Sequence, residues 1–230
     1  MYSWIQYHVL IELTRHPLRR YSQLRPRDVE GNLFMYHLKG LIGEGLVEKT
    51  DGQYCLTIKG LQVVGTLSLK TGRMRKQPKI LNAIICRNEA GEYLFTRWNR
   101  QPNVGLVSFP HGMMHYGEPV ITMAAHELAE KAGLKADLAY KGDVYVRGML
   151  AGVLDRHMLV HLFEAIHYES ADEAIEAVSE HYWASLDSQR PEEFVPGFYE
   201  IARLVENKPH GVLFEDIVIE IGAPSGAGST

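Results

Sequence analysis

Residues 112–134 read GMMHYGEPVITMAAHELAEKAGL, and the second half has the apolar spacing of an amphipathic helix. Glu127 and Glu130 stand three residues apart, which places both on one helix face. An apolar set would point into a core: Ile121, Ala124, Ala125, Leu128 and Ala132. Gly112 allows a close backbone approach before the helix, and Gly133 suits its C-terminal end. Paired carboxylates after a glycine loop can hold Mg²⁺ against a phosphate, because a hard cation prefers oxygen ligands.

This stretch resembles the Nudix box, G-x5-E-x7-R-E-U-x-E-E-x-G-U, in which U is a bulky aliphatic residue. The chain supplies the motif residues Gly112, Glu118, Glu127, Leu128, Glu130, Gly133 and Leu134. It departs from the motif at His126, where the family has Arg, and at Lys131, where the family has the second Glu of its EE pair. The resemblance implies a Nudix α/β/α-sandwich domain with a mixed sheet over residues 80–221.

The resemblance also implies a metal site and a substrate class. Glu127 and Glu130 would be the catalytic residues and would hold Mg²⁺ or Mn²⁺, with the backbone carbonyl of His111 as a further metal ligand. Glu118 would support these ligands, and His126 could hydrogen-bond a neighbouring carboxylate. The substrate would be a nucleoside diphosphate linked to a second moiety.

Lys131 decides how much of this chemistry we expect to survive. An ammonium in place of a carboxylate removes a metal ligand and opposes the ion, since two unit charges 4 Å apart repel by about 4 kcal/mol at an effective dielectric near 20. The same Lys131 could bind a phosphate directly. A plain surface helix with a Glu127–Lys131 ion pair is the alternative, and the flanking glycines and Glu118 argue against it.

The composition is that of a globular protein, and the charge is unevenly distributed. The chain has 230 residues, of which 46% are hydrophobic and 23% charged, enough for one large or two modest domains. Residues 1–80 contain 13 Lys/Arg and 6 Asp/Glu, whereas residues 81–230 contain 11 and 22. A basic front and an acidic back predict two domains with different partners, the first suited to a polyanion.

The sequence shows neither a signal peptide nor an apolar run long enough to span a membrane. We therefore expect a cytoplasmic protein with no membrane partner. Cys55 and Cys86 fall in predicted strands without metal-ligand spacing, so we expect buried free thiols.

Residues 1–70 carry the pattern of helices followed by a hairpin. Helices are expected over residues 3–15, from an N-cap at Ser22, and over residues 30–43. The third helix would bury the stripe Phe34, Leu38, Leu41 and Ile42. An Asp51-Gly52 turn joins two short strands, and Thr57 can cap a further helix with Leu61, Val64 and Leu67 on its apolar side.

Residues 36–60, YHLKGLIGEGLVEKTDGQYCLTIKG, resemble the winged-helix domains of ArsR/MarR-like proteins. The resemblance implies that residues 30–43 enter the major groove of double-stranded DNA, with Asn32, Tyr36 and Lys39 facing the bases. The side chains expected to meet phosphates are Arg15, Arg19, Arg20, Arg25 and Arg27. The alternative is a domain for protein contacts or homodimer formation, which Asp51 at the wing tip and a solvent-facing Leu33 would suit.

Residues 71–79 read as a linker, and the rest of the chain alternates strands with a helix. Strands are expected over 80–87, 93–97, 107–109, 137–150, 157–167 and 211–221, with a helix over 194–206. The acidic run 169–180, expected as a loop with a short helix, offers further carboxylates: Glu169, Asp172, Glu173, Glu176 and Glu180. A solvated face is the alternative for each of them. Residues 222–230 are expected to be disordered.

These patterns lead to alternative functions. The first is a ligand-responsive transcriptional regulator, whose Nudix-like domain recognises a nucleoside-diphosphate-type ligand with weak or lost hydrolysis. The second is an active Mg²⁺-dependent Nudix hydrolase that uses its winged helix for dimerisation or targeting. A protein-interaction scaffold is the third.

Overall fold

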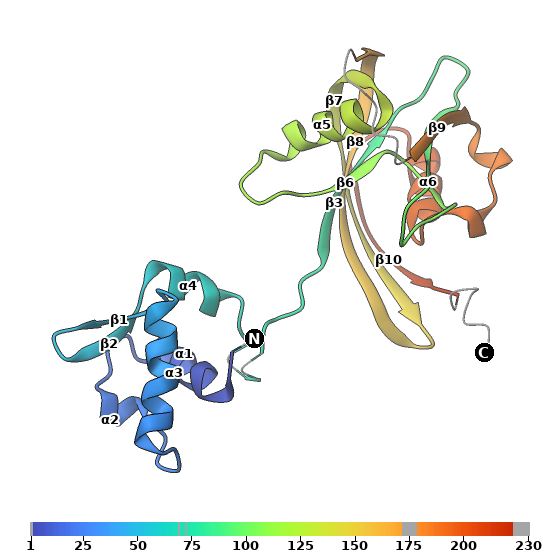
Figure 1. The fold of residues 1–230 in the computed structure, drawn as a ribbon. Helices are drawn as coiled ribbons and strands as arrows, with labels where there is room; N and C mark the ends of the chain where they lie inside the picture. Colours follow the sequence, from blue (N-terminus) through green and yellow to red (C-terminus); the bar gives the residue numbers. More distant parts are fainter. Residues whose placement is uncertain (1, 69, 72, 172–178, 223–230) are drawn as a thin grey trace. The chain divides into compact units, whose positions relative to one another are not determined.

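The computed structural model describes residues 2–68, 70–71, 73–171 and 179–222. The chain divides into two compact units, residues 1–76 and 77–230, and the division falls inside the stretch expected as a linker. Figure 1 shows a mostly helical N-terminal unit and a C-terminal unit built on sheets. No helix within the described residues is long and apolar enough to cross a membrane.

The N-terminal unit packs its helices against a small hairpin. Its elements are α1 (Trp4–Arg15), α2 (Tyr21–Leu24), α3 (Gly31–Gly43), β1 (Val47–Thr50), β2 (Gln53–Leu56) and α4 (Ile58–Gly65). Asp51 and Gly52 both have positive φ, as a two-residue hairpin turn requires, and the Thr57 side chain caps α4 as expected. The core of this unit is apolar and gathers Val9 and Leu10 of α1 with Phe34, Leu38 and Leu41 of α3.

Several sequence-based details of this unit were wrong. The second helix begins at Tyr21 after an Arg20 N-cap, not after Ser22, because the Gln23 side chain accepts from the Arg20 backbone N–H. Ile42 and Leu61 are exposed, because each lies at the margin of a helix stripe that the small core does not reach. Cys55 is half-buried, so of the two free thiols only Cys86, directly after a strand, is buried as expected.

The C-terminal unit is organised by a long hairpin. Within the described residues, five strands form a mixed sheet in the order β10-β7-β8-β3-β6, and three form a second sheet, β5-β4-β9. The first sheet consists of β3 (Lys79–Ile85), β6 (His111–Met113), β7 (Leu134–Leu150), β8 (Val153–Ser170) and β10 (Leu213–Glu220). The second consists of β4 (Tyr93–Trp98), β5 (Val107–Ser108) and β9 (Ser179–Ala184). The mixed sheet expected from the sequence is thus confirmed, with parallel β10–β7 and β3–β8 pairs.

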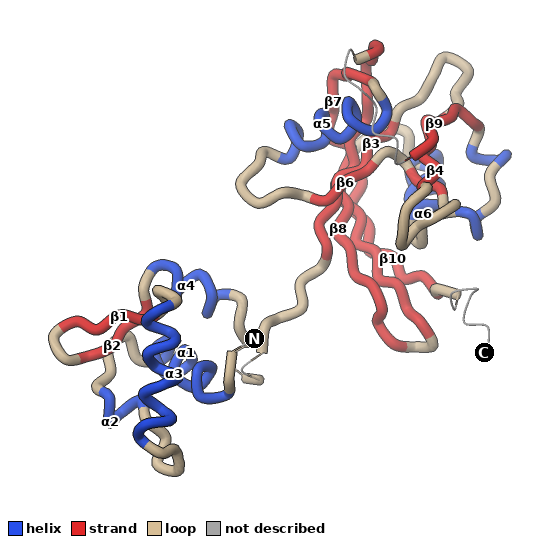
Figure 2. Tube along the Cα trace, viewed as in Figure 1, coloured by secondary structure: helices blue, strands red, loops and turns tan. Residues whose placement is uncertain are grey.

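Helices cover both faces of the mixed sheet (Figure 2). On one face α5 (Val120–Ala132) packs Ala124 and Leu128 against Ile84 and Phe163. On the other, α6 (Phe198–Asn207) packs against the larger core, which includes Val144 and Val160. Short 3₁₀ turns at Leu186–Ser188 and Pro191–Glu193 lead into α6.

Some boundaries in this unit also differ from those expected. The β7–β8 hairpin is longer than predicted and turns at Ala151 and Gly152. The last helix starts at Phe198, because Val195 is held by a backbone hydrogen bond to Val107 and Gly197 has a positive φ. Glu169 and Glu180 lie in strands β8 and β9, whereas Asp172, Glu173 and Glu176 lie outside the described residues.

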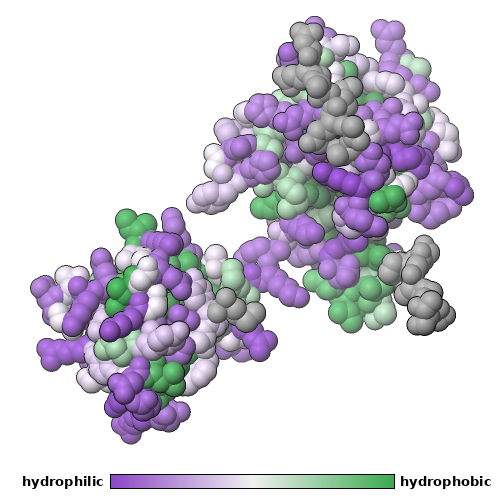
Figure 3. Space-filling view, in the orientation of Figure 1, coloured by the Kyte–Doolittle hydropathy of each residue, from purple (hydrophilic) through white to green (hydrophobic). Residues whose placement is uncertain are grey.

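The surface around the turn of the β7–β8 hairpin is apolar. Val153, Leu154 and Val218 are all at least half exposed there, and Figure 3 shows a hydrophobic patch over this end of the C-terminal unit.

Candidate functional site

Helix α5 has one buried face and one face exposed to solvent. The buried face includes Glu127 and Lys131, one helical turn apart, beside the apolar Ala124 and Leu128. Ile121, expected in the core, is instead half exposed. The helix ends at Gly133, whose left-handed backbone conformation (φ 62°) closes the last turn. The acidic Glu127 and the basic Lys131 therefore lie side by side on the buried face of α5.

Lys131 bridges two oxygen groups inside the protein. Its Nζ donates to the backbone carbonyl of His111 at 2.8 Å and to the carboxylate of Glu127. The Glu127 and Lys131 side chains are only 9% and 8% exposed. The carboxylate is thus compensated by an ammonium, without which its burial would be strongly unfavourable.

Gly112 makes room for this pair. A Cβ placed on Gly112 would lie 1.9 Å from the carboxyl carbon of Glu127, so any side chain there would displace the carboxylate. The backbone N–H of Gly112 donates to the buried Asn82 Oδ1 at 3.2 Å, which fixes β6 against β3. The absence of a side chain at Gly112 therefore lets the Glu127 carboxylate lie directly against the backbone of β6, a close approach that glycine allows.

The ring of His111 is buried in an aromatic setting. It lies 4.8 Å from the Trp98 ring and 4.6 Å from the Phe198 ring, centroid to centroid, and its Nδ1 is 3.0 Å from Ser108 Oγ. Burial lowers the pKa of His111 to about 4, so the ring is neutral at pH 7. The Lys131 ammonium also lies over the face of Trp98, 5.6 Å from the ring centroid.

His181 joins this region from β9 and was missed by the sequence analysis. Its ring nitrogens are 3.1 Å from Thr96 Oγ1 and 3.1 Å from Ser179 Oγ. Burial lowers the pKa of His181. A lone His in an acidic stretch gives no sequence signal for this position, since β4 and α5 are far away along the chain.

Other Nudix-box residues do not share the buried site. Glu130 and His126 lie on the exposed face of α5. The Glu118 side chain is 46% exposed, and its Oε1 lies 3.8 Å from Nδ1 of His115. The structure therefore brings together Glu127, Lys131, Gly112 and the His111 carbonyl, and it leaves Glu130 exposed to solvent beside the buried face.

The residues present do not fit a divalent cation. The two oxygen groups best placed for one, the Glu127 carboxylate and the His111 carbonyl, both bind the Lys131 ammonium. The described residues contain no cluster of three or more His, Cys, Asp or Glu side chains that could hold a metal. The ammonium thus stands where the sequence analysis expected the cation.

The N-terminal unit presents a separate polar surface on α3. Asn32, Tyr36 and Lys39 are exposed, Tyr36 by 73%, and Leu33 beside them is 47% exposed. The basic side chains expected to meet phosphates are also exposed, except for the half-buried Arg19: Arg15, Arg20, Arg25 and Arg27. In the described residues, the Nε of Arg19 is the one buried side-chain nitrogen or oxygen without a hydrogen-bond partner.

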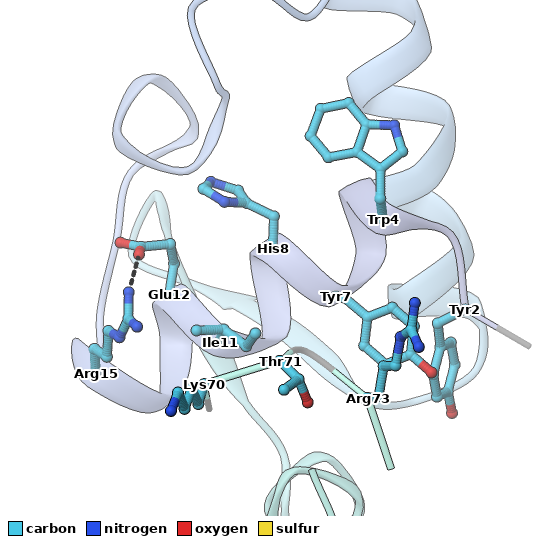
Figure 4. Close-up of a pocket in the computed structure, with 10 residues that line it drawn as sticks. All are labelled: Tyr2, Trp4, Tyr7, His8, Ile11, Glu12, Arg15, Lys70, Thr71 and Arg73. Atoms are coloured by element: carbon cyan, nitrogen blue, oxygen red, sulfur yellow. Dashed lines mark hydrogen bonds and ion pairs between the residues drawn. The ribbon is translucent and has the colours of Figure 1, made fainter. Parts of the chain in front are cut away.

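A pocket of about 520 Å³ lies between α1 and the residues Lys70, Thr71 and Arg73. Figure 4 shows Tyr2, Tyr7 and Arg73 together near one end of α1, with Lys70 beside the ion-paired Arg15 and Glu12 near the other. Apart from Arg15, its lining includes none of the residues expected to act in either domain.

No family profile and no curated protein matches this sequence. Solved structures similar to it include a NUDIX hydrolase from Nitrosomonas europaea, with 15% identity over 57% of this chain and 90% of that one, at a TM-score of 0.48. A MutT NUDIX hydrolase from Burkholderia pseudomallei is 19% identical over 55% of this chain and 96% of its own, at a TM-score of 0.46. The MutT protein of Methanosarcina mazei Go1 is 19% identical over 60% of this chain and all of its own, at a TM-score of 0.45.

Proposed function

We propose that the C-terminal unit is a Nudix-like domain that binds a nucleoside-diphosphate-type ligand without metal-dependent hydrolysis. We further propose that it controls DNA binding by an N-terminal winged helix, so that the chain is a ligand-responsive transcriptional regulator. One observation carries the loss of metal chemistry: the Lys131 ammonium lies 2.8 Å from the His111 carbonyl and is paired with Glu127.

Electrostatics supports this part of the proposal. A unit charge 4 Å from the ammonium would be repelled by about 4 kcal/mol at an effective dielectric near 20, and a divalent ion by roughly twice that. A cation would also have to displace Lys131 from both of its oxygen partners, leaving an ammonium buried without compensation. The negative charge of Glu127 is therefore balanced by the Lys131 ammonium, a side chain of the same helix, and not by a bound metal ion.

The test of this part compares the wild type with Lys131→Glu. We expect ADP and ADP-ribose to raise the melting temperature of the wild type without Mg²⁺, and no phosphate to be released with or without it. Lys131→Glu should gain a melting-temperature response to Mg²⁺, because it exchanges the ammonium for a carboxylate beside Glu127. Equal Mg²⁺-dependent hydrolysis by both proteins would favour the alternative function, an active hydrolase.

The DNA-binding part rests on the N-terminal unit. Helices followed by a hairpin, the exposed Asn32, Tyr36 and Lys39, and the basic charge of residues 1–80 together suit a helix placed in the major groove. Leu33 is the feature that a protein interface would explain better.

The DNA test is a mobility-shift assay at low salt with fragments upstream of the protein's own gene. The wild type should bind one fragment in a salt-dependent manner, and ADP should change the affinity. Lys39→Ala should weaken binding, whereas Lys135→Ala, an exposed lysine of the C-terminal unit, should not. Absence of any shift at low salt would exclude the regulator and leave a dimerisation or targeting role for this unit.

A further inference from the structure

An aspartate–histidine pair lies on the open part of the mixed sheet. Asp143 of β7 and His161 of β8 are directly opposite in the register, and Asp143 Oδ1 is 2.7 Å from His161 Nδ1. The two side chains are 25% and 20% exposed, so they are partly shielded but reachable from solvent. Neither residue stands in a motif that the sequence analysis singled out.

The pair is on the same sheet face as the Glu127–Lys131 site. Asn82 of β3 is in register with His161 on one side and with Gly112 on the other, and directly opposed residues of adjacent strands share a face. Adjacent strands are about 4.8 Å apart, so His161 and Gly112 are separated by roughly 10 Å across the sheet. Phe163, two residues along β8, lies under α5, and His161 is the next residue of that face.

The Asp143 carboxylate orients the imidazole. Its Oδ1 lies 2.7 Å from His161 Nδ1, so the ring donates Nδ1–H to the carboxylate and turns Nε2 away from it. Burial, together with the Asp143 carboxylate nearby, raises the pKa of Tyr140 to about 12, so the phenol stays protonated beside the pair.

The second ring nitrogen of His161 is free to meet a ligand. Among the described residues none hydrogen-bonds His161 Nε2, and Arg19 Nε is the one buried side-chain nitrogen or oxygen there without a partner, so Nε2 reaches solvent. The groups that face the ring are Asp143 and Tyr140 from β7 and the uncharged Asn82 from β3. The charged Glu127 and Lys131 of α5 neutralise each other.

Two cations on this face are already engaged. Arg147 forms two hydrogen bonds to Asp216, at 3.0 and 3.1 Å, and Lys131 is bound by Glu127 and the His111 carbonyl. His157 of β8, in register with Arg147, lies further from α5 than His161 does. A phosphate bound beside α5 therefore meets His161 first among these groups.

We propose that His161, oriented by Asp143, binds a phosphate oxygen of the nucleoside-diphosphate ligand through Nε2–H. This inference rests on the proposed function and names the side chain that would meet the ligand's phosphate. Asp143 acts as a positioning residue, and His161 is the residue that touches the ligand.

The experiment is calorimetric titration of the full chain with ADP, without divalent ions. His161→Asn should bind ADP about tenfold or more weakly than the wild type, the size of one charged hydrogen bond. Asp143→Asn should also weaken ADP binding, and Asp143→Glu, which restores a carboxylate beside the ring, should recover part of the affinity, which a purely structural role would not do.

The controls separate the phosphate contact from other effects. His167→Asn alters the equivalent but exposed His167–Asp137 pair on the same two strands and should bind ADP as the wild type does. Adenosine, which lacks the phosphates, should bind wild type and His161→Asn equally, and circular dichroism checks the fold of each variant. If His161→Asn misfolds, His161→Gln and the comparison of Asp143→Asn with Asp143→Glu decide the question.

Equal ADP affinity in wild type and a folded His161→Asn would overturn this inference and leave the proposed function standing. No ADP binding by the wild type would instead overturn the proposed function, and this inference with it.

Discussion

The substitution Lys131→Met tests the central feature of the C-terminal unit. Methionine keeps most of the side-chain volume but removes the ammonium, so the Glu127 carboxylate and the His111 carbonyl lose their shared donor. Both side chains of the ion pair are less than one-tenth exposed, so water does not replace the lost contact. Breaking a buried pair on one side typically destabilises a protein by about 3–5 kcal/mol.

This magnitude is large for the C-terminal unit, because whole domains are stable by only about 5–15 kcal/mol. For a unit of residues 77–230 we expect a melting-temperature loss of about 6–20 °C, taking roughly 2–4 °C per kcal/mol at this size. Urea unfolding followed by circular dichroism and by fluorescence measures it, since Trp98 lies beside Lys131 and reports on the site.

A double-mutant cycle isolates the ion pair from the loss of packing. Glu127→Gln should also destabilise, because it leaves the ammonium buried without a compensating negative charge. The double variant Lys131→Met/Glu127→Gln should lose less than the sum of the two single variants, since neither charge is then buried alone. Lys135→Met, at an exposed lysine, should change stability by no more than about 0.5 kcal/mol. A loss under about 1 kcal/mol for Lys131→Met, or additive effects in the cycle, would refute the reasoning.

Three further predictions concern other groups. Gly112→Ala should destabilise the C-terminal unit, because its Cβ would overlap the Glu127 carboxyl group. Gly43→Ala, with open space around its Cβ in α3, should stabilise the N-terminal unit by up to about 1 kcal/mol. Thermal denaturation measures whether each variant has a lower or a higher melting temperature than the wild type. Since burial lowers the pKa of His111 to about 4, below its unfolded value near 6.5, its contribution of about 3 kcal/mol is fully present above pH 6.5 and is lost as the pH falls towards 4. This acid-induced loss, measured by urea titration at several pH values, should shrink in His111→Gln and would be unchanged if the ring were exposed. Burial also raises the pKa of the Cys86 thiol to about 12, so Ellman's reagent should modify Cys55 in the native protein and reach Cys86 only after denaturation.

Local patterns were enough for much of the architecture. The Asp51-Gly52 turn, the Thr57 cap, the Gly133 helix end and the long apolar strands depend on neighbours within a few residues, so they could be read from the sequence. Errors fell where packing decides: Ile42 and Ile121 fit apolar stripes but lie outside the cores. The start of α6 moved to Phe198 because β5, far away in sequence, binds Val195.

The site shows the same division. The sequence by itself determined that Glu127 and Lys131 are one helical turn apart, that a glycine precedes the helix, and that an ammonium stands where a carboxylate was expected. Only the tertiary structure decided that this helix face is buried while Glu130 faces solvent, because burial depends on the sheet against which α5 packs. Likewise, β3 alone brings His161 and Gly112 to one face, since strand register is a property of the folded sheet.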